Sequence, residues 1–301
     1  MALMVHDSLE ELLGNTPMVK LNRLVNIGGA SIYAKLDYCN PGRSVKDRIA
    51  LNMIRDGENR GALKPGGTII EPTAGNSSIS LTIFGRRAGY DVVIVMPDTD
   101  NTVLVKMLKQ LGAKVELTSG DKGLRGAKER VLKLCKKEKS FFYPDQFNNP
   151  SNPEIHRNKT AKEIIKAMGN KKIDAFVSGV GTGGTITGVG ESLKAKYPDV
   201  KIVAVEPAES SVLSGGQPGM HFINGIGAGF IPPVLNMDII DSVEKVSSRD
   251  AQSMAEQIRK EEGLLAGVSS GAVLMASLNV ASRMKKEQNV VSFFADAMVG
   301  A

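Results

Sequence analysis

The sequence predicts an α/β protein with two doubly wound parallel-sheet domains. Short apolar runs alternate with amphipathic stretches along the 301 residues, which is the pattern of βαβ units. A polar break rich in asparagine and proline at residues 148–153 divides the chain, and the length suits two medium domains with sizeable cores. We therefore expect a smaller domain at residues 39–147 and a larger one that combines residues 1–38 and 148–301.

The elements of the first half follow from hydrophobic periodicity. Val45, Ile49 and Met53 recur at helical spacing, which predicts a helix that ends near residue 58. Ser44 is its expected N-cap, and Asp47 would close a weak capping box. The other elements expected before the break are helices at residues 8–13, 79–88, 102–111 and 123–137 and strands at residues 18–21, 31–36, 68–71, 91–96, 114–117 and 141–143.

The second half repeats the alternation, apart from one long segment without a pattern. Residues 206–233 are rich in glycine and proline, and loops of this length inside compact domains are usually functional or mobile. We expect the N-terminal helix and strands to fold back onto this second domain. Its own expected elements are helices at residues 156–168, 184–196, 248–262 and 271–285 and strands at residues 173–178, 201–205 and 290–294.

Composition excludes several classes of function. The net charge of +6 is mildly basic, but aromatic residues make up only 5% and tryptophan is absent, so a nucleic-acid surface is not expected. Two cysteines, Cys39 and Cys135, lack metal-ligand spacing and indicate a reducing compartment. The three histidines show no zinc-binding pattern, so no metal is expected.

We expect a cytoplasmic protein. Asp7 and Glu10 come too early for a secretory signal peptide. No window reaches about 18 uninterrupted apolar residues, so no transmembrane helix is expected either.

Lys46 occupies an unusual position for a lysine. It lies in the first turn of the helix expected after Ser44, where the positive end of the helix dipole favours a neutral amine. A lone lysine is usually just solvated, so the assignment of a chemical role depends on the turns that follow.

A glycine-rich turn at residues 178–185 follows an apolar strand and opens a helix. Backbone N–H groups and the helix N-terminus make an anion cradle there, and the small residues let the backbone approach a phosphate. Gly179, Gly181 and Gly184 also satisfy GxGxxG, and Glu206 ends the next strand. A nicotinamide-dinucleotide oxidoreductase is therefore a competing interpretation.

Two further turns have the same strand-turn-helix position. In the turn at residues 71–77, Asn76 or Ser77 either caps the helix or binds a carboxylate or an aromatic hydroxyl. In the turn at residues 266–272, a serine either caps the helix or hydrogen-bonds a ring nitrogen. A lysine amine, an asparagine turn, a phosphate cradle and a hydroxyl are together what pyridoxal phosphate requires, with Lys46 forming the Schiff base.

At these positions the chain resembles a known family. It is similar to cysteine synthase (O-acetylserine sulfhydrylase), one of the fold-type II pyridoxal-phosphate enzymes with a tryptophan synthase β-like fold. The resemblance covers nearly the whole chain and is carried by the motifs NPGRSVKDR, EPTAGN, DQFNNPSNPEIH, GVGTGGTITG, GIGAGFIPP and AGVSSGA.

The resemblance implies a role for each matching residue. Lys46 would hold the cofactor and move the Cα proton, Asn76 would bond the cofactor's 3′-oxygen, and Ser269 would face the pyridine nitrogen, with Ser270 as the alternative. Gly225 and its neighbours would line the acceptor's entrance. The phosphate would lie against Gly181, Thr182, Gly183, Gly184 and Thr185, and the substrate carboxylate against Thr73, Ala74, Gly75, Ser77 and Gln146.

The implied reaction is a β-replacement, in which O-acetyl-L-serine and sulfide give L-cysteine through an α-aminoacrylate intermediate. The enzyme would be a homodimeric transferase of cysteine biosynthesis whose smaller domain is mobile and closes on substrate. Ala228 and Gly229 offer no counter-charge for the ammonium of homocysteine, which favours sulfide as the acceptor. The alternatives are a cystathionine β-synthase, an L-cysteine lyase releasing hydrogen sulfide, and a non-catalytic relative that binds pyridoxal phosphate.

The chain departs from the family pattern at four places. Arg43 stands where a small residue is usual, and Ala74 and Ser78 replace a serine and a glycine of the usual TSGNTG loop. Residues 98–106 lack the usual Met-Ser-x-Glu-Arg, and residues 295–301 differ from the family's proline-aspartate and ERYLS-like segment. These departures bear on the substrate more than on the cofactor.

Overall fold

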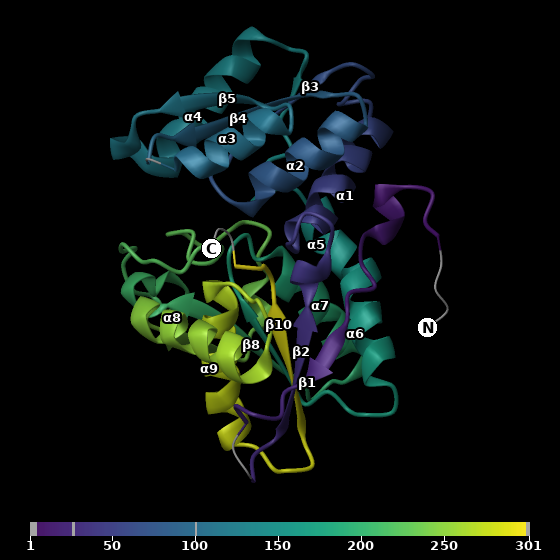
Figure 1. Cartoon of the computed structure of the whole chain (residues 1–301), viewed down its shortest axis with the longest axis vertical. Coiled ribbons are helices and arrows are strands. Elements are labelled where there is room, and N and C mark those ends of the chain that lie inside the picture. Colours follow the sequence, from purple (N-terminus) through teal and green to yellow (C-terminus); the bar gives the residue numbers. More distant parts are fainter. Residues whose placement is uncertain (1–4, 26–27, 100, 299–301) are drawn as a thin grey trace. The chain divides into compact units, whose positions relative to one another are not determined.

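The computed structural model describes residues 5–25, 28–99 and 101–298, and these fall into two compact units (Figure 1). The large unit consists of described residues from Met1–Val45 and Asn152–Ala301, and the small unit is Lys46–Ser151. Our sequence-based boundaries at residues 39 and 147, and the mobility of the smaller domain, stay predictions. Both units are α/β with mainly parallel sheets, which confirms the predicted fold class.

The large unit is built on a six-stranded sheet in which only the edge strand β1 runs antiparallel. The first two strands of the chain join this sheet beside the last strand, β10. The carboxyl ends of its parallel strands meet at one edge, where ligands bind in open α/β sheets. In spatial order the strands are β1 (Met18–Lys20), β2 (Ser31–Leu36), β10 (Asn289–Phe294), β7 (Ala175–Gly179), β8 (Lys201–Pro207) and β9 (Ser242–Val246).

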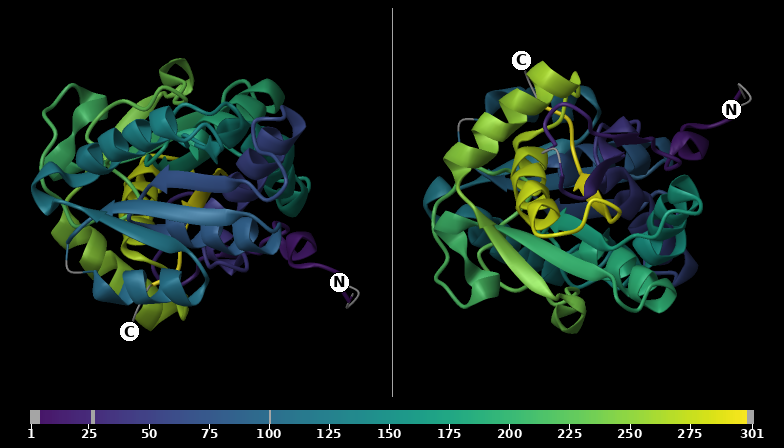
Figure 2. Two further views of the ribbon diagram at one scale, coloured as in Figure 1. Left: turned by 90° about the horizontal axis from the view of Figure 1, so that it is seen from above. Right: turned by 90° about the horizontal axis from the view of Figure 1, so that it is seen from below.

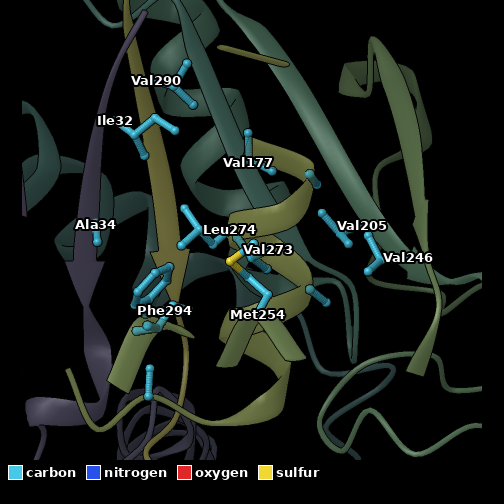
Figure 3. Close-up of a cluster of buried hydrophobic side chains, with 14 of the residues drawn as sticks. Ile32, Ala34, Val177, Val205, Val246, Met254, Val273, Leu274, Val290 and Phe294 are labelled. Atoms are coloured by element: carbon cyan, nitrogen blue, oxygen red, sulfur yellow. The ribbon is translucent and has the colours of Figure 1, made fainter. Parts of the chain in front are cut away.

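Helices cover both faces of the large sheet. On one face α8 (Ser248–Gln257) and α9 (Val268–Ser282) contribute Met254 and Leu274 to a buried cluster that includes Val177 of the sheet (Figure 3). On the other face lie α6 (Ala161–Met168) and α7 (Gly184–Lys196), where Phe176 and Phe293 meet edge to face. The short helix α5 (Ser151–Ile155) precedes α6 along the chain. Burial on both faces explains why these strands read as continuous apolar runs.

The small unit has a four-stranded, fully parallel sheet, seen from above in the left panel of Figure 2. Ala127 and Val131 of α4 cover one face and pack on Ile70 and Val95. The strands are β5 (Lys114–Thr118), β4 (Asp91–Pro97), β3 (Thr68–Pro72) and β6 (Phe141–Phe142), and the helices are α1 (Lys46–Asn59), α2 (Asn76–Arg87), α3 (Thr102–Gln110) and α4 (Gly123–Lys137).

Helices α1 and α2 cover the opposite face of this sheet, and glycines bring them close to it. A Cβ built on Gly85 of α2 would lie within 2.9 Å of the side chains of Val92 and Ile69. A Cβ on Gly57 of α1 would lie 2.5 Å from the Phe142 ring. Short helical segments complete the described chain: 3-10 turns at Leu9–Leu12, Asp37–Cys39, Gly120–Lys122, Ala208–Ser210, Val212–Ser214 and Met237–Ile239, and π-helical turns at His156–Thr160 and Ile258–Glu262.

Several elements differ from the sequence-based expectation, and the helices expected from residues 79 and 271 begin at Asn76 and Val268. Strand β9 was not expected, and the helix expected from residue 156 begins earlier, with α5 and a π-helical turn before α6. The expected N-cap at Ser44 is wrong, because α1 begins at Lys46. Ser44 forms a bridge with Asp296, and the Val45 N–H donates to the Ala295 carbonyl at 2.8 Å, so this segment is extended before the helix starts.

No helix in the described ranges combines the length and apolar character needed to cross a lipid bilayer.

Candidate active site

Lys46, the candidate Schiff-base lysine, is the first residue of α1 in the small unit and is half-buried. The next residue, Asp47, is fully buried, and its Oδ1 accepts a hydrogen bond from Ser80 Oγ of α2 at 2.6 Å. This bond fixes the first turn of α1 against α2, so the backbone that carries the lysine amine is held in place.

The turn at residues 73–77 leaves β3 and enters α2, and its N-cap residue is Gly75. Asn76 and Ser77 therefore lie inside the first turn of α2, so neither is its N-cap. The Ser78 hydroxyl donates back to the Gly75 carbonyl at 2.6 Å. Ser78, which departs from the family pattern, thus ties the turn to the helix that follows it.

The structure brings two predicted substrate residues together within the small unit. Ser77 Oγ donates to Gln146 Oε1 at 2.6 Å, and both side chains are buried. Gln146 follows β6 along the chain, 69 residues from Ser77. The oxygen of the Gln146 amide only accepts, and its nitrogen is the donor, which is the kind of group that a carboxylate accepts from.

A buried carboxylate supports this pair and was missed by the sequence analysis. Glu71, near the end of β3, is 1% exposed, and it accepts the backbone N–H groups of Asp145 at 3.1 Å and Gln146 at 3.3 Å. Burial raises the pKa of Glu71 from 4.5 to about 8, although both N–H bonds oppose that rise. The carboxyl therefore titrates near neutral pH.

The predicted phosphate cradle is the turn between β7 and α7 in the large unit. Gly183 has φ 86° and is the N-cap residue of α7, which begins at Gly184. A Cβ on Gly181 would lie 2.2 Å from the Gly225 carbonyl oxygen, and one on Gly184 would lie 1.8 Å from Asn152 Oδ1. The Cβ on Gly181 would meet backbone, which cannot yield, so only glycine fits there. The turn opens α7, and the N–H groups of a helix N-terminus are the donors that phosphate binding uses.

Two residues of the DQFNNPSNPEIH motif support this cradle, and the sequence analysis gave them no role. Asn152 Nδ2 donates to Thr182 Oγ1 at 3.0 Å. His156 is buried, with Nε2 3.3 Å from Thr185 Oγ1 and Nδ1 2.9 Å from Thr160 Oγ1. His156 begins a π-helical turn, a rare geometry that often marks functional sites. The sequence signal was the polar loop just before it.

Ser269 lies in the first turn of α9, whose N-cap residue is Gly267. Its buried hydroxyl donates to Asp296 Oδ1 at 2.7 Å rather than capping the helix. Among the described residues, the fully buried Ser270 hydroxyl has no hydrogen-bond partner. The choice of Ser269 over Ser270 for the pyridine nitrogen stays a prediction.

The predicted site residues divide between the two units. Lys46, the turn from Thr73 to Ser77 with Asn76, and Gln146 belong to the small unit. The cradle Gly181–Thr185, Gly225 and Ser269 belong to the large unit. Both units offer groups that suit pyridoxal phosphate. The small unit offers an amine, and the large unit offers a glycine turn in which added Cβ atoms would collide with their neighbours.

Comparison with known proteins places the chain in a class. The family model described as "Pyridoxal-phosphate dependent enzyme" matches residues 9–296. The chain therefore belongs to the family of pyridoxal-phosphate dependent enzymes, which confirms the predicted cofactor.

Individual relatives narrow the class. The chain is 47% identical over 286 residues to a cysteine synthase of Staphylococcus aureus strain Mu50, covering 95% of this chain and 92% of the relative. The crystal structure of cysteine synthase from Entamoeba histolytica has a TM-score of 0.92 and 39% identity, covering 98% of this chain and 88% of that one. A hydrogen sulfide-producing enzyme from Fusobacterium nucleatum has a TM-score of 0.93 and 39% identity, covering 98% and 97%. The resemblance to the cysteine synthase family is thereby confirmed.

Proposed function

We propose that this protein makes L-cysteine from O-acetyl-L-serine and sulfide, with pyridoxal phosphate as its cofactor. The observation that carries the proposal is the 47% identity to a cysteine synthase over 95% of the chain. It agrees with the chemistry of the two units, which supply an amine, a phosphate cradle and a set of donors for a carboxylate.

The cofactor's chemistry is that of an electron sink: when bound, it stabilises negative charge at the substrate Cα. We assign Lys46 the two tasks of holding the cofactor and moving the Cα proton with its Nζ. When the cofactor is bound, Asn76 would orient its ring through the 3′-oxygen, and the cradle Gly181–Thr185 would bind its phosphate. Ser269 would face the ring nitrogen.

The substrate carboxylate is assigned to the small unit. Thr73 supplies a hydroxyl there, Gln146 supplies an amide, and Gly75 supplies a backbone N–H. Ser77 orients the Gln146 amide, because its hydroxyl donates to Gln146 Oε1. A hydrogen bond to a charged group contributes about 1.5–3 kcal/mol, so the missing hydroxyl at Ala74 is expected to weaken substrate binding.

Sulfide is the acceptor that the segment after Gly225 favours. Gly225, Gly227 and Gly229 all have positive φ, at 93°, 71° and 80°, and the Gly225 carbonyl packs against Gly181 of the cradle. A segment of glycines with Ala228 presents no carboxylate to the ammonium of homocysteine. We also propose a cytoplasmic homodimer that acts on small molecules.

The test is a competition between acceptors. Purified protein receives O-acetylserine with sulfide and homocysteine at equal concentration, and both products are quantified. Predominant cysteine supports the proposal, whereas predominant cystathionine contradicts the choice of acceptor. Sulfide release from cysteine without cysteine synthesis would instead support the lyase, and cofactor binding without any product would support the non-catalytic alternative.

The lysine assignment has its own test. Lys46→Ala protein is expected to lose cysteine synthesis by several orders of magnitude and to lose its visible absorbance on dialysis, because the covalent link to the cofactor is gone. Lys64→Ala in the same unit is the control. Retention of the absorbance by dialysed Lys46→Ala protein would contradict the assignment.

A further inference from the structure

We propose that Glu71 is a positioning residue for Gln146, and that its ionised carboxylate keeps the substrate-carboxylate site in the form that binds substrate. The inference rests on the proposed function, since it gives Gln146 a substrate to bind. It adds a pH-dependent control of substrate affinity by a residue that does not touch the substrate.

The hydrogen bonds of Glu71 favour a carboxylate over a carboxylic acid, in opposition to its burial. Its Oε2 accepts the Asp145 N–H and its Oε1 accepts the Gln146 N–H, so the two oxygens receive two consecutive peptide groups. An ionised carboxylate accepts at both oxygens, whereas the acid carries a proton on one of them. Protonation therefore weakens at least one of the two bonds that hold this turn.

The turn needs such support because its backbone is unfavourable. Asp145 has φ 51°, in the left-handed region that residues other than glycine adopt less readily. Its carbonyl accepts the N–H groups of Asn148 and Asn149, both at 2.9 Å, which secures the later part of the turn. The bonds to Glu71 secure the earlier part, from which the Gln146 side chain departs.

A short path leads from Glu71 to the substrate donors. Glu71 holds the Gln146 backbone, and Gln146 Oε1 accepts from Ser77 Oγ at 2.6 Å. Gln146 and Ser77 are 4% and 5% exposed, so neither side chain has room to adopt another position. A shift of the turn therefore displaces the Gln146 amide assigned to the substrate carboxylate, together with the Ser77 hydroxyl that orients it.

Several charged or titratable groups around Glu71 act on its protonation. Asp145, in the turn, raises its pKa, while Lys128, on α4, lowers it. The Glu71 charge in turn raises the pKa of the Tyr143 phenol, together with burial and Asp145. Burial outweighs the other influences and brings the pKa of Glu71 to about 8. A change of pH between 7 and 9 thus changes the fraction of molecules with a charged Glu71.

The experiment compares pH profiles of the wild type, Glu71→Gln and the control Glu58→Gln. Glu58 is an exposed carboxylate of the same unit that accepts from Tyr90 at 2.7 Å. We expect the wild-type KM for O-acetylserine to fall as the pH rises through 8. This fall should exceed any change in the KM of Glu71→Gln over the same range by about tenfold. Above pH 8 the variant should have a higher KM than the wild type with kcat changed less, and Glu58→Gln should follow the wild type at every pH. Parallel profiles for the wild type and Glu71→Gln would overturn the inference.

A second readout needs neither turnover nor a variant. The backbone amide resonances of Asp145 and Gln146 in the wild-type holoenzyme should shift with an apparent pKa of about 8, because their acceptor changes charge. Amide shifts that stay constant from pH 6.5 to 9.5 would also overturn the inference. Wild-type protein without cysteine synthesis at any pH would contradict the proposed function instead, and the amide titration would then decide the role of Glu71 alone.

Discussion

The two units prepare their anion sites in opposite ways. In the large unit, the cradle Gly181–Thr185 is shaped by backbone, with glycines where a Cβ would collide. In the small unit, the candidate carboxylate site is made of side chains, with Gln146 held by Ser77 and by the buried Glu71. The glycine backbone of the cradle carries no titrating group of its own, and its nearest one is His156 beside Thr185, whereas the side-chain site is braced directly by a buried carboxyl. The site that we propose for the cofactor is thus shaped by backbone, and the site that we propose for the substrate is shaped by side chains.

The largest effect is expected from a methyl group added to the backbone site. Gly181→Ala places a Cβ against the Gly225 carbonyl, and backbone cannot yield as a side chain does. Cofactor affinity should fall about a hundredfold or more, measured by titrating cofactor-free protein and following absorbance. In the matched variant Gly75→Ala the new Cβ meets nothing within 4 Å, so cofactor affinity should be kept. Equal losses in both variants would remove the distinction between the two sites.

A second prediction concerns stability against pH. The folded pKa of Glu71, about 8, lies above its ordinary 4.5, so the folded state prefers the protonated form. The contribution of this group to the free energy of unfolding is therefore greatest below pH 4.5 and is lost as the pH rises through 8. Between pH 5 and pH 9 the wild type should lose on the order of 3 kcal/mol relative to Glu71→Gln, measured by urea unfolding. A constant difference would show that Glu71 does not titrate in the folded protein.

A smaller effect is expected when the side-chain site is restored to the family pattern. The double variant Ala74→Ser with Ser78→Gly regains one hydroxyl donor, so its dissociation constant for O-acetylserine should fall about tenfold. Spectral titration of the bound cofactor measures it. The single variants separate the two changes, because Ser78→Gly alone only removes the bond to the Gly75 carbonyl. Weaker binding by the double variant would indicate a loop rebuilt for another substrate.

The smallest effect concerns the segment that leads into α1. Arg43 has φ 63°, and glycine adopts this conformation without strain, which explains why a small residue is usual there. Arg43→Gly should raise the free energy of unfolding by about 0.5–1 kcal/mol, since the relieved strain exceeds the added freedom of the unfolded chain. Arg60→Gly, within an exposed ion pair, is the control and should not stabilise. Destabilisation by Arg43→Gly would mean that the arginine side chain makes a compensating contact.

Sequence patterns predicted the fold and the cradle because both depend on local signals. Glycines at a strand-helix junction mark the turn at residues 179–185 without knowledge of any partner. Glu71, by contrast, binds the backbone of Asp145 and Gln146, which follow it by 74 and 75 positions. Ser269 likewise meets Asp296 only in the folded chain. No local pattern distinguishes a buried bracing carboxylate from a surface one.

Local reasoning also failed where tertiary pairing decided the backbone. Strand β9 is an edge strand with a mostly half-exposed sequence, so its apolar signal is weak. Ser44 is a good N-cap by composition, but the pairing of Val45 with Ala295 delays the helix. Both errors arise from contacts that lie far away in sequence.

The position of β10 has a consequence for how the chain folds while it is being synthesised on the ribosome. This last strand lies between β2 and β7, near the middle of the large sheet (Figure 1). Until residues 289–294 have left the exit tunnel, β1 and β2 cannot be joined to β7, β8 and β9, and two inner strand edges stay open. The small unit, by contrast, is complete once residue 151 has emerged. A nascent chain therefore carries a finished small unit beside two unjoined pieces of sheet, which is the stage at which chaperones have an exposed edge to protect.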